Sequence, residues 1–302
     1  MKPSPEEAGP KADSRMETLH DIPALRSRLA GWRAAGLRIA LVPTMGNLHE
    51  GHIALVQTAL AGADRVVATV FVNPLQFGPG EDLDSYPRTL AEDARQLQAV
   101  GCQLLFAPAE ATMYPQGRAG HTQVEVPGLS AELCGASRPG HFRGVTTVVA
   151  KLFNLVQPDL AVFGQKDYQQ LLLIRRMALD LNMDIEIVGL PTVREADGLA
   201  MSSRNAYLTA AERARAPVLF RTLTAVAAAV AAGTSPEQAE RDAAQALRTA
   251  GFEPDYVSVR RRVDLALPGP ADSALVVLAA AHLGRARLID NLELDRPLPV
   301  QG

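Results

Sequence analysis

The sequence predicts an α/β protein in which an open parallel sheet with helices on both faces is followed by a smaller α+β domain. Short apolar runs alternate with helical patterns between residues 16 and 190. Beyond residue 190, two alanine-rich helical segments precede consecutive strand-like runs. The length of 302 residues also fits two domains of about 150 residues each.

The first elements alternate between helix and strand. Asp21 is a suitable N-cap for a helix over 21–35, and Gly36 supplies a left-handed stop. The apolar run LRIALVP at 37–43 is typical of a buried strand. There follow a helix from about Gly51, a strand over 66–72, a helix over about 88–99 and a strand over 104–108.

The same alternation resumes after a loop-rich stretch. We expect a helix over 145–156, a strand over 159–163, a helix over 168–181 and a strand over 185–188. Strands that are apolar throughout and alternate with helices indicate a parallel sheet covered on both faces. Residues 16–190 are therefore predicted to form a Rossmann-like domain of the nucleotide-binding kind.

Residues 191–302 are predicted to form the smaller α+β domain. Capping-box patterns at Thr209–Glu212 and Ser235–Gln238 each open an alanine-rich helix, and Gly251 ends the second. Strand-like runs follow at 255–260, 274–278 and 285–289 with no helical segment between them. Consecutive strands of this kind favour a small antiparallel sheet.

Composition excludes several classes of protein. The net charge of -3 gives no overall electrostatic footprint for nucleic acid. The longest apolar run, 225–232, is far shorter than the roughly 20 residues of a membrane helix, so no membrane association is expected. Cys102 and Cys134 rule out a disulfide framework; two free buried thiols are favoured over one bridge. Residues 1–15 lack an apolar core and are predicted to be a disordered tail.

The segment PTMGNLHEGH at 43–52 lies where a buried strand passes into a helix. Ligands bind at the carboxyl ends of parallel strands, and helix N-termini there attract anions. His49 and His52 are three residues apart and share a helix face, where two imidazoles can hydrogen-bond a polyphosphate. Two alternatives remain open: an ordinary strand–helix turn with half-exposed histidines, or half of a metal site.

A second polar cluster, GQKDYQQ at 164–170, directly follows the strand over 159–163. Lys166 is a point charge suited to phosphate. Asp167 suits ribose hydroxyls or a helix cap. Two such clusters at strand ends of one sheet favour a shared site.

Several weaker candidates lie outside these two clusters. Met201-Ser202-Ser203-Arg204 suits a mobile loop that closes over phosphates, although the pattern is common. Gln76 could bind a carboxylate or hydroxyl, and Glu92-Asp93 could help to hold Mg²⁺ or simply be solvated. His141 could lie near the site. The remaining isolated side chains, namely Cys102, His20, His121 and His282, are interpreted as structural.

No GxGxxG follows a strand, and no GxxxxGK[S/T] or GxSxG motif is present. These absences disfavour a dehydrogenase, a P-loop protein and a hydrolase with a nucleophile elbow.

Taken together, the motifs resemble those of the pantothenate synthetase (pantoate–β-alanine ligase) family. The matching segments occur in the family's order between residues 43 and 208: PTMGNLHEGH (43–52), FVNPLQF (71–77), YPRT (86–89), RPGHFRGV (138–145), KLFNLVQPDLAVFGQKDYQQ (151–170) and MSSRN (201–205). Each segment alone is weak, but the joint pattern is specific. The extra N-terminal tail lies outside the motifs.

Two free thiols favour a protein of the reducing cytoplasm. The resemblance implies a homodimer of the HIGH-motif nucleotidylyl transferase superfamily, with a Rossmann-like domain and a C-terminal lid. It implies that ATP, (R)-pantoate and β-alanine are converted to pantothenate, AMP and pyrophosphate through a pantoyl-adenylate, with Mg²⁺ accompanying ATP.

The resemblance also implies residue roles. His52, as proton donor, with His49, Lys166 and Arg204 would be catalytic, and Gln76 and Gln170 would contact pantoate, Gln76 also lying near β-alanine. The implied ATP contacts are Met45, Gly46, Asn47, Leu48, His49, Glu50, Gly51, His52, Gly164, Gln165, Lys166, Asp167, Val193, Met201, Ser202, Ser203 and Arg204.

Rival functions remain at this point. A related transferase or synthetase could activate a different acid. A catalytically silent nucleotide sensor and a His-x-x-His metal protein belong to other classes, which pyrophosphate release and elemental analysis would distinguish.

Overall fold

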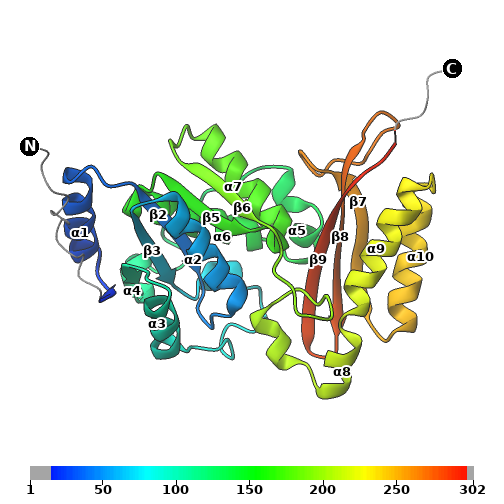
Figure 1. The fold of residues 1–302 in the computed structure, drawn as a ribbon, viewed down its shortest axis with the longest axis horizontal. Coiled ribbons are helices and arrows are strands. Elements are labelled where there is room, and N and C mark those ends of the chain that lie inside the picture. The colour runs from blue at the N-terminus through cyan, green and yellow to red at the C-terminus, as the bar shows by residue number, and fades with distance from the viewer. Residues whose placement is uncertain (1–14, 298–302) are drawn as a thin grey trace, which may run out of the picture.

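The computed structural model describes residues 15–297, which form two layered units side by side (Figure 1). The tail predicted over residues 1–15 lies outside the described residues, apart from Arg15.

The first unit is built on a six-stranded sheet with the order β1-β4-β3-β2-β5-β6, in which every pairing is parallel. The predicted fold class is therefore confirmed. The edge strand β1 was missed, because its three residues are too few to show a pattern. The strands are β1 (Glu17–Leu19), β2 (Ile39–Thr44), β3 (Arg65–Val70), β4 (Leu104–Phe106), β5 (Leu160–Gly164) and β6 (Glu186–Leu190).

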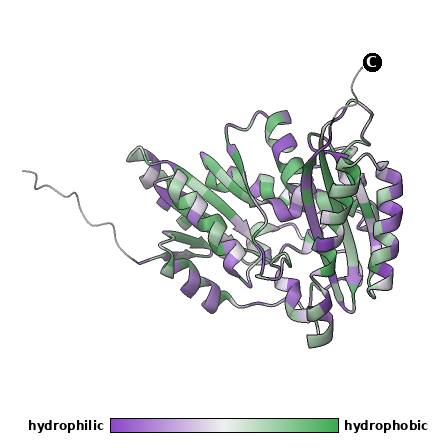
Figure 2. Cartoon of the chain, turned by 45° about the vertical axis from the view of Figure 1, so that its right-hand side comes forward, coloured by the Kyte–Doolittle hydropathy of each residue, from purple (hydrophilic) through white to green (hydrophobic). Residues whose placement is uncertain are grey.

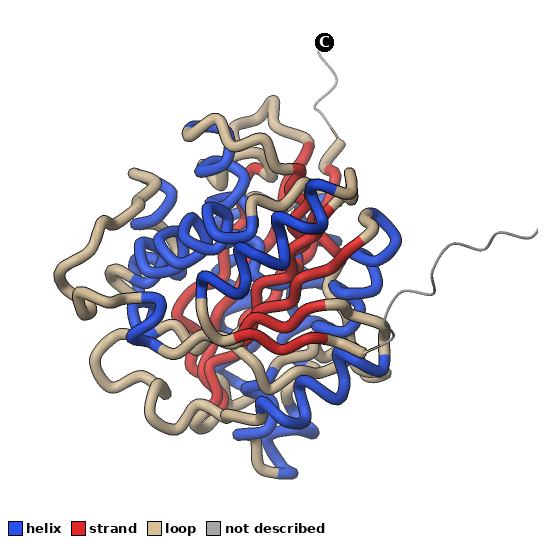
Figure 3. Tube along the Cα trace, turned by 90° about the vertical axis from the view of Figure 1, so that its left-hand side faces the viewer, coloured by secondary structure: helices blue, strands red, loops and turns tan. Residues whose placement is uncertain are grey.

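Helices cover both faces of this sheet, as Figure 3 shows. In β2, Ile39 and Leu41 pack with α1 and α6 on one face, whereas Ala40 and Val42 pack with α2 and α3 on the other. This alternation explains why the strands are apolar throughout. The helices are α1 (Ile22–Ala34), α2 (Glu50–Gly62), α3 (Leu90–Ala99), α6 (His141–Val156) and α7 (Tyr168–Asp180), with the short α4 (Glu110–Met113) and α5 (Cys134–Ser137) in the loop-rich stretch.

Local signals agree with these bounds. The Asp21 side chain accepts the N–H of Ala24 at the start of α1, and Gly36 has the predicted positive φ of 71°. The prediction for α6 began four residues late, because His141–Gly144 carries no apolar period. Cys102 and Cys134 are both buried and free, as predicted.

The second unit contains an antiparallel sheet, β7-β8-β9, as expected. Its elements are α8 (Ala210–Arg215), α9 (Val218–Ala231), α10 (Pro236–Thr249), β7 (Glu253–Arg261), β8 (Ala274–Leu283) and β9 (Ala286–Asp295). Thr209 and Glu212 form the predicted reciprocal capping box, and Ser235 accepts the N–H of Gln238. The helix that Thr209 opens is only six residues long, because Pro217 separates α8 from α9.

The second sheet lies between two apolar layers. Val277, Ala279 and Ala281 of β8 pack against α9 and α10, whereas Val276 and Leu278 on the opposite face contact Tyr168 and Leu133 of the first unit. Figure 2 shows the apolar residues gathered in the strands of both sheets. The second sheet therefore has a covered face on each side.

Residues 210–231 are long and apolar enough to cross a membrane by length and composition alone. Their apolar side chains have another role, because Leu219, Leu223, Val226 and Val230 are buried in the core of the second unit. This stretch therefore packs as a pair of helices in the core of the second unit.

Candidate active site

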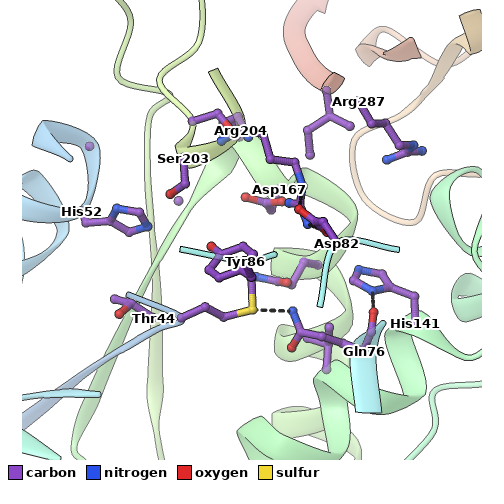
Figure 4. A pocket seen from close by; sticks show the side chains of 18 of the residues that line it. Thr44, His52, Gln76, Asp82, Tyr86, His141, Asp167, Ser203, Arg204 and Arg287 are labelled. Carbon is purple, nitrogen blue, oxygen red and sulfur yellow. Dashed lines mark hydrogen bonds and ion pairs between the residues drawn. The ribbon is translucent and has the colours of Figure 1, made fainter. Parts of the chain in front are cut away.

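A cavity of about 800 Å³ lies where the two units meet. The residues at the carboxyl ends of β2, β3, β5 and β6 lead directly into it, and residues of β7, β9 and the β8–β9 turn line its other side. Figure 4 shows labelled side chains from both units pointing into this space. The site thus lies at the carboxyl ends of the parallel strands, where open α/β sheets commonly bind ligands.

His49 and His52 stand at the start of α2 with their ring centroids 4.0 Å apart. Nδ1 of His49 accepts the N–H of Gly51 at 3.1 Å, and Nδ1 of His52 accepts the N–H of His49 at 3.3 Å. A backbone N–H can only donate, so both Nδ1 atoms are unprotonated in these bonds. In each neutral ring the proton is therefore on Nε2.

Burial keeps both rings neutral. Desolvation, with the positive charge of Lys166, lowers the pKa of His49 to about 4. Desolvation, with His49 and then Lys166, lowers the pKa of His52 to about 3. At neutral pH each histidine therefore presents a hydrogen-bond donor at Nε2 and carries no charge.

The turn before α2 is held by a buried carboxylate. Gly46 has a φ of 83°, and a Cβ there would lie 2.9 Å from Oδ2 of Asp93. Asp93 is 1% exposed and accepts the N–H groups of Asn47 and Leu48 at 3.1 and 2.8 Å. The Oγ1 of Thr89 donates to the same carboxylate. The backbone N–H groups of Asn47 and Leu48 are therefore already bonded to Asp93.

The acidic pair predicted to help hold Mg²⁺ does not line the cavity. Asp93 holds the turn, and the exposed Glu92 pairs with Arg95 at 2.5 Å. Within residues 15–297, no group of three or more His, Cys, Asp or Glu side chains is arranged to hold a metal. The two carboxylates therefore do not fit a magnesium site, and the half metal site considered for the histidines finds no further ligand.

Lys166 and Asp167 lie in a single 3₁₀ turn, Gln165–Asp167, between β5 and α7. Lys166, Asp167 and Gly164 line the cavity, whereas Gln165 does not. Lys166 and both histidines line the same cavity, and the charge of Lys166 contributes to the lowered pKa of each histidine. The two predicted clusters therefore share one site.

The segment from Met201 to Arg204 lines the cavity. Ser203 Oγ donates to the carbonyl of Asn47 at 3.0 Å, which ties this segment to the histidine turn. The Nε and Nη2 atoms of Arg204 donate to Asp82 at 3.1 and 2.9 Å. Tyr207 donates to the same carboxylate at 3.3 Å. Two loops distant in sequence therefore meet through one ion pair.

Gln76 lies on the cavity wall, where its Nε2 is 3.0 Å from Sδ of Met45. His141 Nδ1 donates to the carbonyl of Gln76 at 2.7 Å, and its Nε2 accepts from Arg138 at 3.0 Å. Burial and the charge of Arg138 lower the pKa of His141 to about 4. Arg138 also pairs with Glu81 at 2.5 Å, so His141 and Arg138 support the backbone of Gln76.

Most of the predicted site residues converge on this cavity. Those that line it are Met45, His49, Gly51, His52, Gln76, Gly164, Lys166, Asp167, Gln170, Val193, Met201, Ser202, Ser203 and Arg204. The others, Gly46, Asn47, Leu48, Glu50, Gln165, Glu92 and Asp93, lie outside its lining.

Sequence reasoning missed the lining contributed by the second unit. Asp255, His282, Arg285 and Arg287 all face the cavity, and Arg287 bonds Asp255 at 2.8 Å. His282, which was interpreted as structural, lies 3.7 Å from Asp255. No local pattern marks these residues, because only the docking of the second sheet brings them to the site. Asp82 and Tyr86 also line the cavity, from the loop of the first unit that precedes α3. Tyr86 lies in the YPRT segment noted in the sequence, but neither residue was given a role.

Fold and site together define a Rossmann-like α/β protein of the nucleotide-binding class. Comparison with known proteins then identifies its family: the family model described as pantoate-beta-alanine ligase matches residues 17–293. The chain belongs to the pantoate–β-alanine ligase family, and it is a ligase.

The sequence is similar to those of known relatives over nearly its full length. Proteins named pantothenate synthetase from Shewanella amazonensis and Thioalkalivibrio sulfidiphilus are 61% and 60% identical, over 93% of this chain and 100% and 99% of theirs. The pantothenate synthetase structure from Thermus thermophilus superposes with a TM-score of 0.85 at 48% identity, covering 93% of this chain and 100% of that one.

A second solved relative was determined with ligands. The pantoate-beta-alanine ligase of Francisella tularensis, described as complexed with beta-gamma ATP and beta-alanine, is 31% identical with a TM-score of 0.79. It covers 92% of this chain and 97% of its own.

Proposed function

We propose that this protein condenses (R)-pantoate with β-alanine to pantothenate, using ATP and passing through a pantoyl-adenylate. The observation that carries the proposal is the convergence of two neutral imidazoles, Lys166 and Arg204 on one cavity. These groups come from separate segments, and all of them suit phosphate oxygens.

In the first step, a carboxylate oxygen of pantoate attacks the α-phosphorus of ATP. The new O–P bond forms as the bond to the pyrophosphate leaving group breaks. Catalysis of such a transfer is mostly positioning and stabilisation of negative charge on the phosphoryl oxygens. His49, His52, Lys166 and Arg204 supply hydrogen-bond donors and two positive charges for that purpose.

The histidines act in this scheme by donating hydrogen bonds. The family resemblance implies that His52 is a proton donor, but a pKa near 3 leaves no ionised imidazolium at neutral pH. An Nε2–H aimed into a buried cavity instead provides a fixed dipole that needs no reorganisation during the reaction.

In the second step, the β-alanine amine attacks the acyl carbon of the adenylate. The C–N bond forms, the C–O bond to AMP breaks, and the nitrogen loses a proton. Gln76 and Gln170 are the proposed pantoate contacts, with Gln76 also near β-alanine. The adenylate is prone to hydrolysis, so cover by the second unit protects it from water.

The nucleotide itself is proposed to run along three segments. Met45–His52 and Gly164–Asp167 take the phosphates and ribose, the backbone of Val193 contacts adenine, and Met201–Arg204 closes over the phosphates. Mg²⁺ is proposed to accompany the triphosphate, and no step above depends on a protein ligand to it.

Two further properties belong to the proposal. Full-length similarity to the family supports a cytoplasmic homodimer. Sedimentation or light scattering of the purified chain tests its oligomeric state.

The decisive experiment incubates the protein with ATP, pantoate and β-alanine, singly and together, and follows pyrophosphate, AMP and acyl-AMP. Pantoate-dependent pyrophosphate release without β-alanine supports the two-step route. Release that requires both acids together contradicts the adenylate, and no release at all indicates a silent nucleotide-binding protein.

A further inference from the structure

We propose that Asn291, on β9 of the second unit, is a positioning residue for Lys166. The inference rests on the proposed role of Lys166 at the phosphates. Asn291 is 6% exposed, and its Nδ2 donates to the carbonyls of both Gln165 and Lys166 at 2.9 Å. An amide nitrogen carries two hydrogens, and in Asn291 both are donated to the turn that contains Lys166.

The neighbouring residue anchors a second part of the nucleotide site. Asp290 is 3% exposed and pairs with Arg194 through two bonds of 2.7 and 2.9 Å. The guanidinium of Arg194 lies 3.7 Å from the ring centroid of Phe220, which fixes its plane. Arg194 directly follows Val193, the proposed adenine contact. Adjacent residues of β9 thus hold two segments of the ATP site.

The carbonyl of Asn291 joins these two anchors. It accepts from Nη2 of Arg194 at 3.2 Å, while the Asn291 N–H donates to Asp290 at 2.8 Å. The side chain of Asn291 therefore projects from a backbone that is itself held in place. As a result, its hydrogen bonds hold the turn Gln165–Asp167 in a defined position.

Positioning matters because lysine is a flexible side chain whose usefulness depends on where its backbone is held. Gln165–Asp167 is only a three-residue turn, and it starts where the sheet ends. A misplacement of about 1 Å in a group that orients a reacting phosphate can cost about a hundredfold in rate. The second unit therefore does more than cover the cavity, since it sets the place of the lysine.

The test compares Asn291→Ala and Asn291→Asp in the full chain, each alone and combined with Lys166→Ala. The rate measured is adenylate formation in a single turnover with saturating ATP and pantoate. Asn154→Ala is the matched control, because Asn154 also donates from Nδ2 to a backbone carbonyl, that of Ala150, away from the cavity.

We expect Asn291→Ala to slow adenylate formation by about tenfold to a hundredfold, with KM for pantoate changed less than twofold. Asn154→Ala should remain near the unaltered rate. In the Lys166→Ala background, the additional loss from Asn291→Ala should be under twofold, because the group that it positions is gone.

Asn291→Asp separates hydrogen bonding from packing. Asp fills the same space but offers a carboxylate to two carbonyl oxygens, so it should be at least as slow as Ala. A faster rate for Asp than for Ala overturns the proposal in favour of simple packing. Melting temperatures within a few degrees of the control confirm that the variants are folded.

The measurements distinguish a wrong role for Lys166 from a wrong role for Asn291. If Lys166→Ala leaves adenylate formation unchanged, the proposed function of Lys166 is wrong. If Lys166→Ala slows it while Asn291→Ala has no effect, or the same effect in both backgrounds, only the positioning role is overturned.

Discussion

At the residue scale, the central feature is that both cavity histidines are uncharged donors. Their Nδ1 atoms accept backbone N–H groups of α2, and burial disfavours the imidazolium. The sequence located the pair, because a polar motif at a strand end is a recognisable signal. It could not predict the tautomers, which depend on how each ring turns toward the first amides of the helix.

We predict that His52→Ala lowers kcat by about 10²–10³, the scale of one lost donor to a developing oxyanion. Steady-state kinetics with all three substrates saturating would measure this loss. The melting temperature should be determined alongside, because the substitution also leaves the His49 N–H without its acceptor. An unaltered kcat would remove His52 from the mechanism.

The neutral histidines also predict a pH dependence of stability. Between pH 6.5 and about 3, the unfolded chain binds a proton at position 52 that the folded chain does not, so the free energy of unfolding falls as pH falls. His49 and His141 act in the same direction.

The matched variant is His52→Gln, which cannot titrate. Between pH 6.5 and 5, it should lose about 1–2 kcal/mol less stability than the unaltered protein, as measured by urea unfolding. Parallel losses in the two proteins would mean that His52 takes up a proton over the same pH range in the folded and unfolded chains, and would contradict the prediction.

At the element scale, the turn between β2 and α2 shows how a distant carboxylate shapes a binding loop. Asp93 lies on α3, 45 residues from Leu48, whose N–H it accepts. The sequence predicts an acidic pair on a helix, which could help to hold Mg²⁺ or simply be solvated. Only the packing of α3 against α2 reveals that Asp93 faces the turn while Glu92 faces solvent.

Asp93→Asn is predicted to destabilise the protein by about 1–3 kcal/mol, because one of two buried amides loses its acceptor. The concentration of Mg²⁺ that gives half-maximal activity should not change. Thermal unfolding and a magnesium titration measure the two effects. An intact melting temperature with a raised magnesium requirement would favour the metal-binding role instead.

At the scale of the whole molecule, the second sheet connects the two units. Val276 and Leu278 pack on the first unit, while the alternate residues of β8 pack on α9 and α10. The alternation of helices and strands predicted the two architectures. It could not predict that His282 and Arg287 line the cavity or that Asn291 bonds the turn of Lys166, because docking between units leaves no periodic pattern in the sequence. The division at residues 190 and 191 remains a prediction.

Because the sheet is shared, we predict that both units unfold in one transition. Leu278→Ala should lower the stability of the whole chain by about 2–5 kcal/mol, without splitting the transition. Leu267→Ala, at a side chain that is 70% exposed, is the control and should change it by under about 0.5 kcal/mol. Calorimetry showing two separate transitions would contradict this prediction.

The ion pair between Arg204 and Asp82 has a practical consequence. Within residues 15–297, Nη1 of Arg204 has no hydrogen-bond partner. This nitrogen can therefore donate to an incoming phosphate while Nε and Nη2 remain bonded to Asp82. One bound nucleotide would then hold the segments around Asp82 and Arg204 in place at the same time. Limited digestion with a protease should accordingly find the peptide bonds around residues 78–86 and 202–207 shielded together, at the same concentration of ATP.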